Sequence, residues 1–108
     1  MEEQSVSLSI DFVLEVGHFM PNYPKGHQNT RIHGHSYFGK AVFKGPINKK
    51  TGCLLDFEYT QLKLKSILQN YDHRMLNDIK GLEIPSTEKL SQVLYLSLIH
   101  ISEPTRPY

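Results

Sequence analysis

The chain has 108 residues, of which 39% are hydrophobic and 21% are charged, as is typical of one globular domain. The formal net charge of +1 argues against a nucleic-acid or anionic-membrane partner, and the apolar runs are too short to span a bilayer. The N-terminus lacks the features of a secretory signal, and the single cysteine, Cys53, excludes an internal disulfide. The composition therefore predicts a cytoplasmic protein in a reducing compartment.

The first expected element is a strand that ends at His18. Its apolar residues alternate with polar ones, as in a strand with one buried face, and they are Leu8, Ile10, Phe12, Leu14 and Val16. His18 continues the apolar register and precedes a loop from about Phe19 to Thr30. A lone histidine at such a position is either a packed core residue or a ligand. His27 in the loop is a further histidine within reach, although solvation is its simpler interpretation.

A second strand is expected from about Ile32 to Lys44, and it carries the motif on which the functional prediction depends. His33 and His35 are separated by one residue, so their side chains project from the same face, with Cα atoms about 6.6 Å apart. Two imidazoles at this spacing can bind one metal ion at about 2.0–2.1 Å each. With His18 as third ligand, the set is that of a catalytic zinc site with one open position. The alternative is a pair of surface or packed histidines.

Two helices are expected after a polar turn at residues 48–52. The first, roughly Glu58 to Asn70, carries one apolar stripe with i, i+3, i+4, i+7 spacing, formed by Leu64, Ile67, Leu68 and Tyr71. Asp56 is suited to cap it, because its carboxylate can accept backbone N–H groups. Ser86 or Thr87 is expected to cap the second helix, which has an acidic first turn.

Two further groups invite a chemical interpretation. Asp72 next to His73 is a candidate acid/base pair, because a carboxylate can orient an imidazole and favour its protonated form. The alternative is a surface pair that caps the preceding helix. Cys53, in the segment before the first helix, is interpreted as a buried small hydrophobe rather than a base.

Several segments occur in the order and spacing of one known family. They are Phe12-x-x-Glu15-x-x-His18, Gly26-His27, Arg31 to Tyr37, Thr51 to Phe57, Asp72-His73-x-x-Leu76-Asn77-Asp78 and Pro85 to Glu88. Together they resemble the 6-pyruvoyl-tetrahydropterin synthase family, and most closely its bacterial branch, the 6-carboxytetrahydropterin synthases of queuosine (7-deazapurine) biosynthesis. The resemblance implies an α+β tunnelling fold with the order β-β-α-α-β-β. It also implies a homo-oligomer with active sites at subunit interfaces.

The resemblance further implies the site residues and the reaction. Three histidines match the family's Zn²⁺ ligands, namely His18, His33 and His35. Asp72 and His73 match its charge-relay pair, and Ser86 stands where the family usually has a threonine near the pterin. The implied activity is that of a carbon-carbon lyase acting on a pterin triphosphate. It converts 7,8-dihydroneopterin triphosphate to 6-carboxy-5,6,7,8-tetrahydropterin, acetaldehyde and triphosphate.

Two features depart from the family pattern. Asn29 occupies the position of the family's catalytic cysteine, and an amide cannot act as the general base that a thiolate can. Residues 96–108 resemble the translation of a transposase adapter used in sequencing libraries, and the alternative is a native strand in this segment. We therefore expect residues 1–95 to form a partial tunnelling-fold domain that lacks its last two strands, followed by a non-native tail. A 6-pyruvoyl-tetrahydropterin synthase and a non-catalytic paralogue that binds zinc or pterin remain as alternatives.

Overall fold

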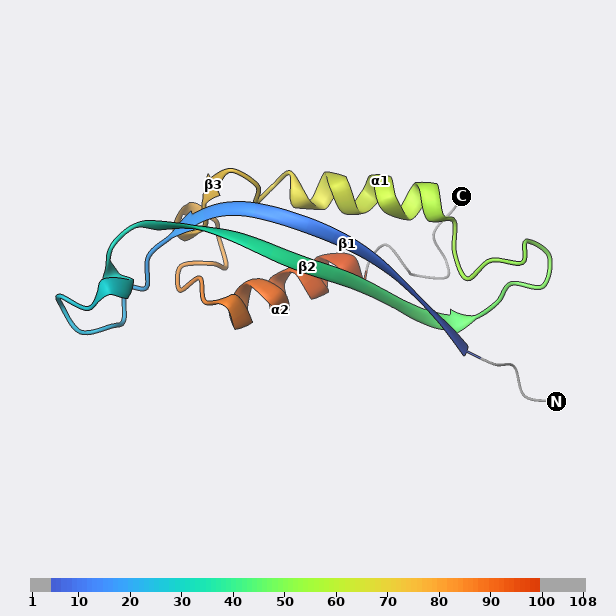
Figure 1. Cartoon of the computed structure of the whole chain (residues 1–108), viewed down its shortest axis with the longest axis horizontal. Coiled ribbons are helices and arrows are strands. Elements are labelled where there is room, and N and C mark those ends of the chain that lie inside the picture. Colours follow the sequence, from blue (N-terminus) through green and yellow to red (C-terminus); the bar gives the residue numbers. More distant parts are fainter. Residues whose placement is uncertain (1–4, 100–108) are drawn as a thin grey trace.

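A computed structural model describes residues 5–99 and shows two long paired strands beside two helices (Figure 1). Strand β1 spans Ser5–His18 and strand β2 spans His33–Pro46. They pair in antiparallel register over their whole length. The loop between them contains the 3₁₀ helix η1, Gln28–Thr30. The order of two strands and then two helices is the one predicted from the sequence.

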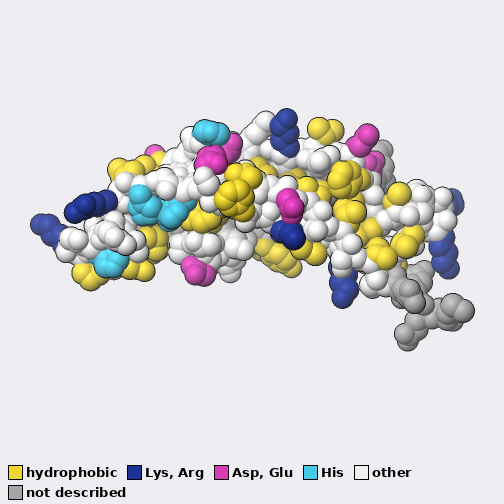
Figure 2. All heavy atoms as spheres, in the orientation of Figure 1, with side chains coloured by type: hydrophobic (Ala, Val, Ile, Leu, Met, Phe, Trp, Pro, Cys, Tyr) yellow, Lys and Arg dark blue, Asp and Glu magenta, His cyan; other side chains and the backbone are white. Residues whose placement is uncertain are grey.

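Both long strands have one face against the helices and one exposed face, because side chains alternate along a strand. The buried residues of the inner face are Ile10, Leu14, Val16, Ala41 and Phe43. The outer face carries charged side chains and also exposed apolar ones, which include Val13, Phe38 and Val42. Figure 2 shows hydrophobic side chains gathered over the strands. The alternation predicted from the sequence is confirmed on both strands.

Helix α1 spans Phe57–Leu68, and helix α2 spans Thr87–Leu98. Asp56 caps α1, since its Oδ1 accepts a hydrogen bond of 3.0 Å from the backbone N–H of Tyr59, as predicted. Ser86, rather than Thr87, caps α2 by accepting a 3.0 Å hydrogen bond from the Lys89 N–H. Each helix buries one stripe, which contains Leu64 in α1 and Leu90 and Leu94 in α2.

The connection between the helices contains two short elements that the sequence did not reveal. Strand β3, Arg74–Met75, pairs in parallel with β1 at residues 16 and 17, which gives the sheet the order β2-β1-β3. The 3₁₀ helix η2, Leu76–Asp78, follows at once. A strand of two residues is too short for any alternation to be visible in the sequence.

The core consists of two adjoining clusters. The cluster nearer the end of β1 contains Leu14, Val16, Tyr71, Leu76, Leu82, Leu90 and Leu94. The other lies along the middle of the strands and contains Ile10, Ala41, Phe43 and Leu64. The first cluster joins β1 to both the inter-helix connection and α2, so it brings the segment before α2 close to the end of β1.

The prediction that Cys53 is a buried small hydrophobe is wrong, because its side chain is exposed. It ends the polar turn, where its N–H donates to Thr51 Oγ1 at 3.2 Å and its carbonyl accepts from the Asn48 N–H at 2.8 Å. These turn hydrogen bonds hold Cys53 outside the core. Leu54 and Leu55, the next two residues, pack against the second cluster instead.

The predicted boundary between residues 95 and 96 stays a prediction. Helix α2 continues through that boundary to Leu98. Most of the proposed tail, residues 100–108, lies outside the described part of the chain. Within residues 5–99, no strand follows α2, and no helix is long and apolar enough to cross a membrane.

Candidate metal centre

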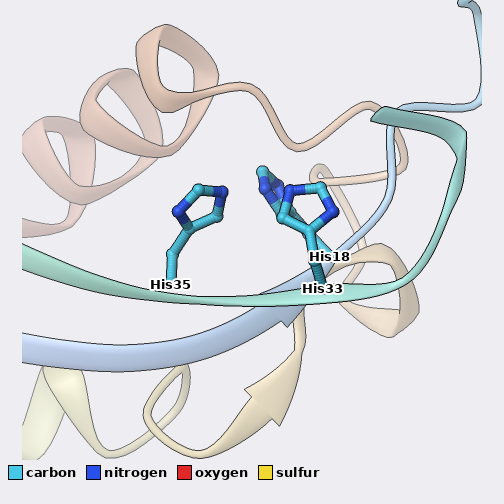
Figure 3. Close-up of side chains that lie close together, drawn as sticks. All are labelled: His18, His33 and His35. Atoms are coloured by element: carbon cyan, nitrogen blue, oxygen red, sulfur yellow. The ribbon is translucent and has the colours of Figure 1, made fainter. Parts of the chain in front are cut away.

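The structure brings His18, His33 and His35 together at one end of the two long strands (Figure 3). The antiparallel register places His18 directly opposite His33, and His35 lies two residues further along the same face of β2. The ring centroids are 4.6 to 4.7 Å apart, and one nitrogen of each ring lies within 4.8 Å of the others. The cluster expected from the spacing of the three histidines is therefore formed in the structure.

Backbone carbonyls orient two of the three rings. His18 Nδ1 lies 2.7 Å from the carbonyl oxygen of Pro85, and His33 Nδ1 lies 2.8 Å from that of Arg31. A carbonyl oxygen can only accept, so each Nδ1 carries the proton and donates it. This tautomer leaves the lone pair on Nε2, which is how histidines are usually presented to a metal ion.

His18 is the buried member of the cluster, with 4% of its surface exposed. Burial lowers the pKa of its imidazole below the usual 6.5, and the neighbouring His33 and His35 lower it further, against the opposing effect of the Pro85 carbonyl. His18 is therefore neutral at pH 7, the form that ligates a metal. Its Nε2 is buried and has no hydrogen-bond partner within the described residues. A buried nitrogen lone pair of this kind normally has a partner.

The donor set fits a divalent transition-metal ion. All three donors are imidazoles, which suit metals of this class, and no carboxylate or thiolate belongs to the cluster among residues 5–99. A bound ion would also satisfy the unpartnered Nε2 of His18. Three protein ligands leave a coordination position for water or substrate, as in catalytic rather than structural sites.

Asn77 holds the chain in place immediately after His18, and this role was not predicted from the sequence. Its Oδ1 accepts from the Phe19 N–H at 3.0 Å, and its Nδ2 donates to the Phe19 carbonyl at 2.9 Å. The two hydrogen bonds fix the end of β1 against η2. The role of the Pro85 carbonyl could not be predicted from the sequence, because every residue has a backbone carbonyl.

Asp72 and His73 form a hydrogen-bonded pair, but the structure does not bring them into the histidine cluster. His73 Nδ1 lies 2.8 Å from Asp72 Oδ2, while Asp72 Oδ1 accepts from the Glu15 N–H at 2.8 Å. The pair immediately precedes β3, so it borders the edge of β1 opposite β2. His73 has a φ of 59°, and its N–H donates to the Glu15 carbonyl. The Asp72 side chain therefore binds β1 instead of capping α1, and the His73 side chain is 76% exposed.

Hydrogen bonds favour the ionised form of the Asp72 carboxyl group. The Glu15 N–H lowers the pKa of the Asp72 carboxyl below its usual 3.8, and the hydrogen bond from His73 lowers it further. Asp72 is thus ionised at neutral pH and accepts from both partners. The exposed Nε2 of His73 is the nitrogen left to exchange a proton with another molecule.

The sequence model of 6-pyruvoyl tetrahydropterin synthase matches residues 7–106, nearly the whole chain. The chain belongs to the 6-pyruvoyl tetrahydropterin synthase family. It is 29% identical over 99 residues to the 6-carboxy-5,6,7,8-tetrahydropterin synthase of Synechocystis sp. (strain ATCC 27184 / PCC 6803 / Kazusa), covering 87% of this chain and 75% of the relative. It is also 29% identical over 97 residues to the enzyme of the same name from Bacillus subtilis (strain 168), covering 84% of this chain and 64% of the relative.

The fold is that of solved members of the family. The structure of Caenorhabditis elegans 6-pyruvoyl tetrahydropterin synthase superposes with a TM-score of 0.82 at 20% identity, over 100% of this chain and 88% of the other. This likeness confirms the α+β tunnelling fold predicted from the sequence. In this family member, the described residues include the first two strands and both helices of that fold.

The other residues singled out in the sequence lie around the cluster without joining it. Asn29 is half-buried in η1, and its N–H donates to His27 Nδ1 at 3.1 Å. His27 thereby caps η1, and its ring lies against Tyr23 with the centroids 4.5 Å apart. Ser86 uses its hydroxyl to cap α2, directly after the proline whose carbonyl orients His18.

Proposed function

We propose that the chain is a zinc-dependent 6-carboxy-5,6,7,8-tetrahydropterin synthase, a carbon-carbon lyase of queuosine (7-deazapurine) biosynthesis. Its substrate is 7,8-dihydroneopterin triphosphate, and its products are 6-carboxy-5,6,7,8-tetrahydropterin, acetaldehyde and triphosphate. Family membership and the names of the two bacterial relatives support this proposal. The observation that carries it is the three-histidine cluster with the buried, unpartnered Nε2 of His18. The proposed location is the cytoplasm.

In this proposal His18, His33 and His35 hold Zn²⁺. When bound there, the metal would supply Lewis acidity toward oxygen atoms of the substrate side chain. The Pro85 and Arg31 carbonyls keep two of the ligands in the correct tautomer. Burial of His18 keeps that ligand neutral and shields it from water.

Asp72 and His73 are proposed to move the proton. The Asp72 carboxylate orients the His73 imidazole through Nδ1, which leaves Nε2 to accept and return a proton. Because the pair borders the opposite edge of β1 from the histidines of β2, we expect it to act in a site shared with a neighbouring subunit. A homo-oligomer is therefore part of the proposal. Ser86, at the start of α2, is proposed to lie near the pterin.

A second candidate function is a non-catalytic paralogue that binds zinc and pterin. Asn29 favours it, because the amide at the position aligned with the family's catalytic cysteine has no accessible pKa. Loss of one acid/base group typically lowers the rate by about 10²–10⁴-fold rather than abolishing it. The two candidates therefore differ in turnover and agree in metal content.

Zinc content tests the part that both candidates share. We expect about one zinc ion per chain, lost in His33→Ala because two imidazoles hold the metal far more weakly than three. His27→Ala is the matched control, since His27 lies in the loop and outside the cluster. Metal analysis of the purified proteins gives the answer. A correctly folded wild-type chain that takes up no zinc would contradict the proposal.

Turnover then separates the candidates. Acetaldehyde release from 7,8-dihydroneopterin triphosphate, measured with the zinc-loaded wild type, establishes the lyase and excludes the non-catalytic paralogue. Zinc binding without turnover favours the paralogue. In that case Asn29→Cys restores the missing thiol and is expected to raise the rate by about 10²–10⁴-fold.

A further inference from the structure

His35 is the one histidine of the cluster whose ring is not held by a backbone carbonyl. His18 and His33 each donate Nδ1–H to such a carbonyl, whereas within residues 5–99 no hydrogen bond orients the ring of His35. His35 is also the exposed member of the three. An exposed imidazole free to rotate is a poor metal ligand, because its rotamer freedom is lost when the metal binds. Another contact is needed to orient it.

The aromatic ring of Tyr37 provides that contact. Tyr37 lies two residues beyond His35 on the same face of β2, and the two rings stack with their centroids 5.3 Å apart and their planes 27° from parallel. The same tyrosine ring makes an edge contact with His18, with centroids 6.5 Å apart at 84°. Tyr37 therefore touches two of the three candidate ligands.

Tyr37 is itself anchored to α2. Thr87, the first residue of the helix, donates its hydroxyl hydrogen to the Tyr37 oxygen at 3.3 Å. The ring is half-buried and packs against the cluster of core residues at this end of the molecule. Tyr37 and Thr87 also line the groove between β2 and α2.

We infer that Tyr37 is a positioning residue of the metal centre, which holds the His35 ring by stacking and is itself held in place by Thr87. The inference rests on the proposed function only in assuming that the three histidines bind zinc. Residues that support metal ligands from outside the coordination shell typically change metal affinity by about 10–100-fold when removed. We expect an effect of this size from loss of the stacked ring.

The test measures Zn²⁺ affinity by competition with a chelating dye, together with the visible spectrum of the Co²⁺-substituted protein. Tyr37→Leu is expected to weaken Zn²⁺ binding by about 10-fold or more and to alter the Co²⁺ ligand-field bands, because His35 is no longer oriented. Phe38→Leu is the matched control. It removes an aromatic ring from the next position of β2, where the side chain is 82% exposed on the outer face. This control is expected to bind zinc with unchanged affinity and an unchanged spectrum.

The result that would overturn the inference is a folded Tyr37→Leu protein whose zinc affinity and Co²⁺ spectrum equal those of the wild type. Circular dichroism establishes that the variant is folded, and Tyr37→Met, whose longer and more flexible side chain fills irregular gaps, replaces it if it is not. A wild-type chain that binds no zinc contradicts the proposed function instead, so the two failures are distinguishable.

A double-mutant cycle tests the anchor independently and uses conservative changes. Tyr37→Phe keeps the stacked ring and Thr87→Val keeps the shape, yet each removes the contact between the two hydroxyl groups. Each is expected to weaken zinc binding by about threefold, with no further loss in the double variant, since both remove the same contact. Additive losses, or no loss in either single variant, would show that Thr87 does not hold Tyr37 for this purpose.

Discussion

At His18 the chain uses a backbone carbonyl, rather than a carboxylate, to orient a candidate metal ligand. The 2.7 Å contact between His18 Nδ1 and the Pro85 oxygen fixes the tautomer without placing a negative charge beside the metal. Three neutral imidazoles add no charge, so a metal ion bound by them would keep its full positive charge. A positive centre of this kind suits the stabilisation of negative charge on a bound substrate.

Asp72, in contrast, carries a charge, because two hydrogen bonds favour the ionised form of its carboxyl group. A carboxyl group whose pKa is lowered on folding stabilises the native state above its unfolded pKa, and this contribution is lost as the pH falls through the lowered folded pKa. We therefore expect the stability of the wild type relative to Asp72→Asn to be greatest near neutral pH and to decline as the pH falls below about 4.

Urea unfolding of the metal-free proteins over a range of pH provides the measurement. Asp11→Asn is the control, because the Asp11 side chain is 81% exposed and lies 3.9 Å from Lys40. Exposed ion pairs contribute little, so this variant should follow the wild-type pH profile. A constant difference between wild type and Asp72→Asn at every pH would show that the Asp72 hydrogen bonds do not favour its ionised form.

Of the two α-helices, α2 is the one whose start contacts residues of the candidate metal centre. Pro85 lies immediately before its cap and orients His18, while Thr87 in its first turn contacts Tyr37. Ser86 lies between these two contacts and caps the helix. The position of the helix start thus determines where two supports of the histidine cluster lie.

Ser86→Ala is expected to lower the free energy of unfolding by about 0.5–2 kcal/mol, because the Lys89 N–H loses its capping acceptor. Ser86→Asp, which also caps helices well, should retain most of the stability. Ser91→Ala is the matched control, an exposed serine in the middle of the same helix where alanine is the better helix former. Urea unfolding of the three variants tests this. Equal effects at positions 86 and 91 would rule out a capping role.

At the scale of the whole molecule, the candidate metal centre joins segments that are distant in the sequence. His18 ends β1, His33 begins β2, and the Pro85 carbonyl precedes α2. A ligand that binds only when these segments are assembled stabilises the native state by mass action. Metal binding is therefore expected to act on the stability of the whole fold.

We expect Zn²⁺ at about 100 times its dissociation constant to raise the free energy of unfolding by about 2.7 kcal/mol, and EDTA to reverse the gain. Chemical unfolding with and without the metal measures the effect. His33→Ala should show no such gain at the same zinc concentration. An equal gain in this variant would place the bound zinc elsewhere in the chain.

The outer face of the sheet carries several exposed apolar side chains. Val13, Phe38 and Val42 are exposed on it, and Lys40 and Asp11 form a 3.9 Å contact across the same two strands. Exposed apolar groups gathered on one face commonly mark an interaction surface. This face is consistent with the homo-oligomer in the proposed function.

Much of this arrangement follows from local patterns in the sequence. Alternation along β1 and β2 predicted which face is buried, and therefore that His18, His33 and His35 share that face. Both helix caps were among the predicted residues, because capping depends on side chains within a few positions of the helix start.

Local patterns failed at two places, one in a turn and one between segments that are distant in the sequence. Cys53 has an apolar neighbourhood in the sequence, yet turn hydrogen bonds hold it outside the core. Asp72 and His73 are adjacent in the sequence, but only the parallel pairing of β3 with β1 places them on the far edge from the histidines.

Residue types were enough to predict the family, the order of the first elements and the three histidines, because period-two alternation and short linked motifs depend on residue type. The folded structure was needed to show which backbone carbonyls orient His18 and His33. It also showed that Thr87 holds Tyr37 in place, and that the Asp72–His73 pair lies outside the histidine cluster. Carbonyl groups are the same in every residue, and both the contact of Thr87 with Tyr37 and the pairing of β3 with β1 join segments that are distant in the sequence, so residue types alone do not reveal them.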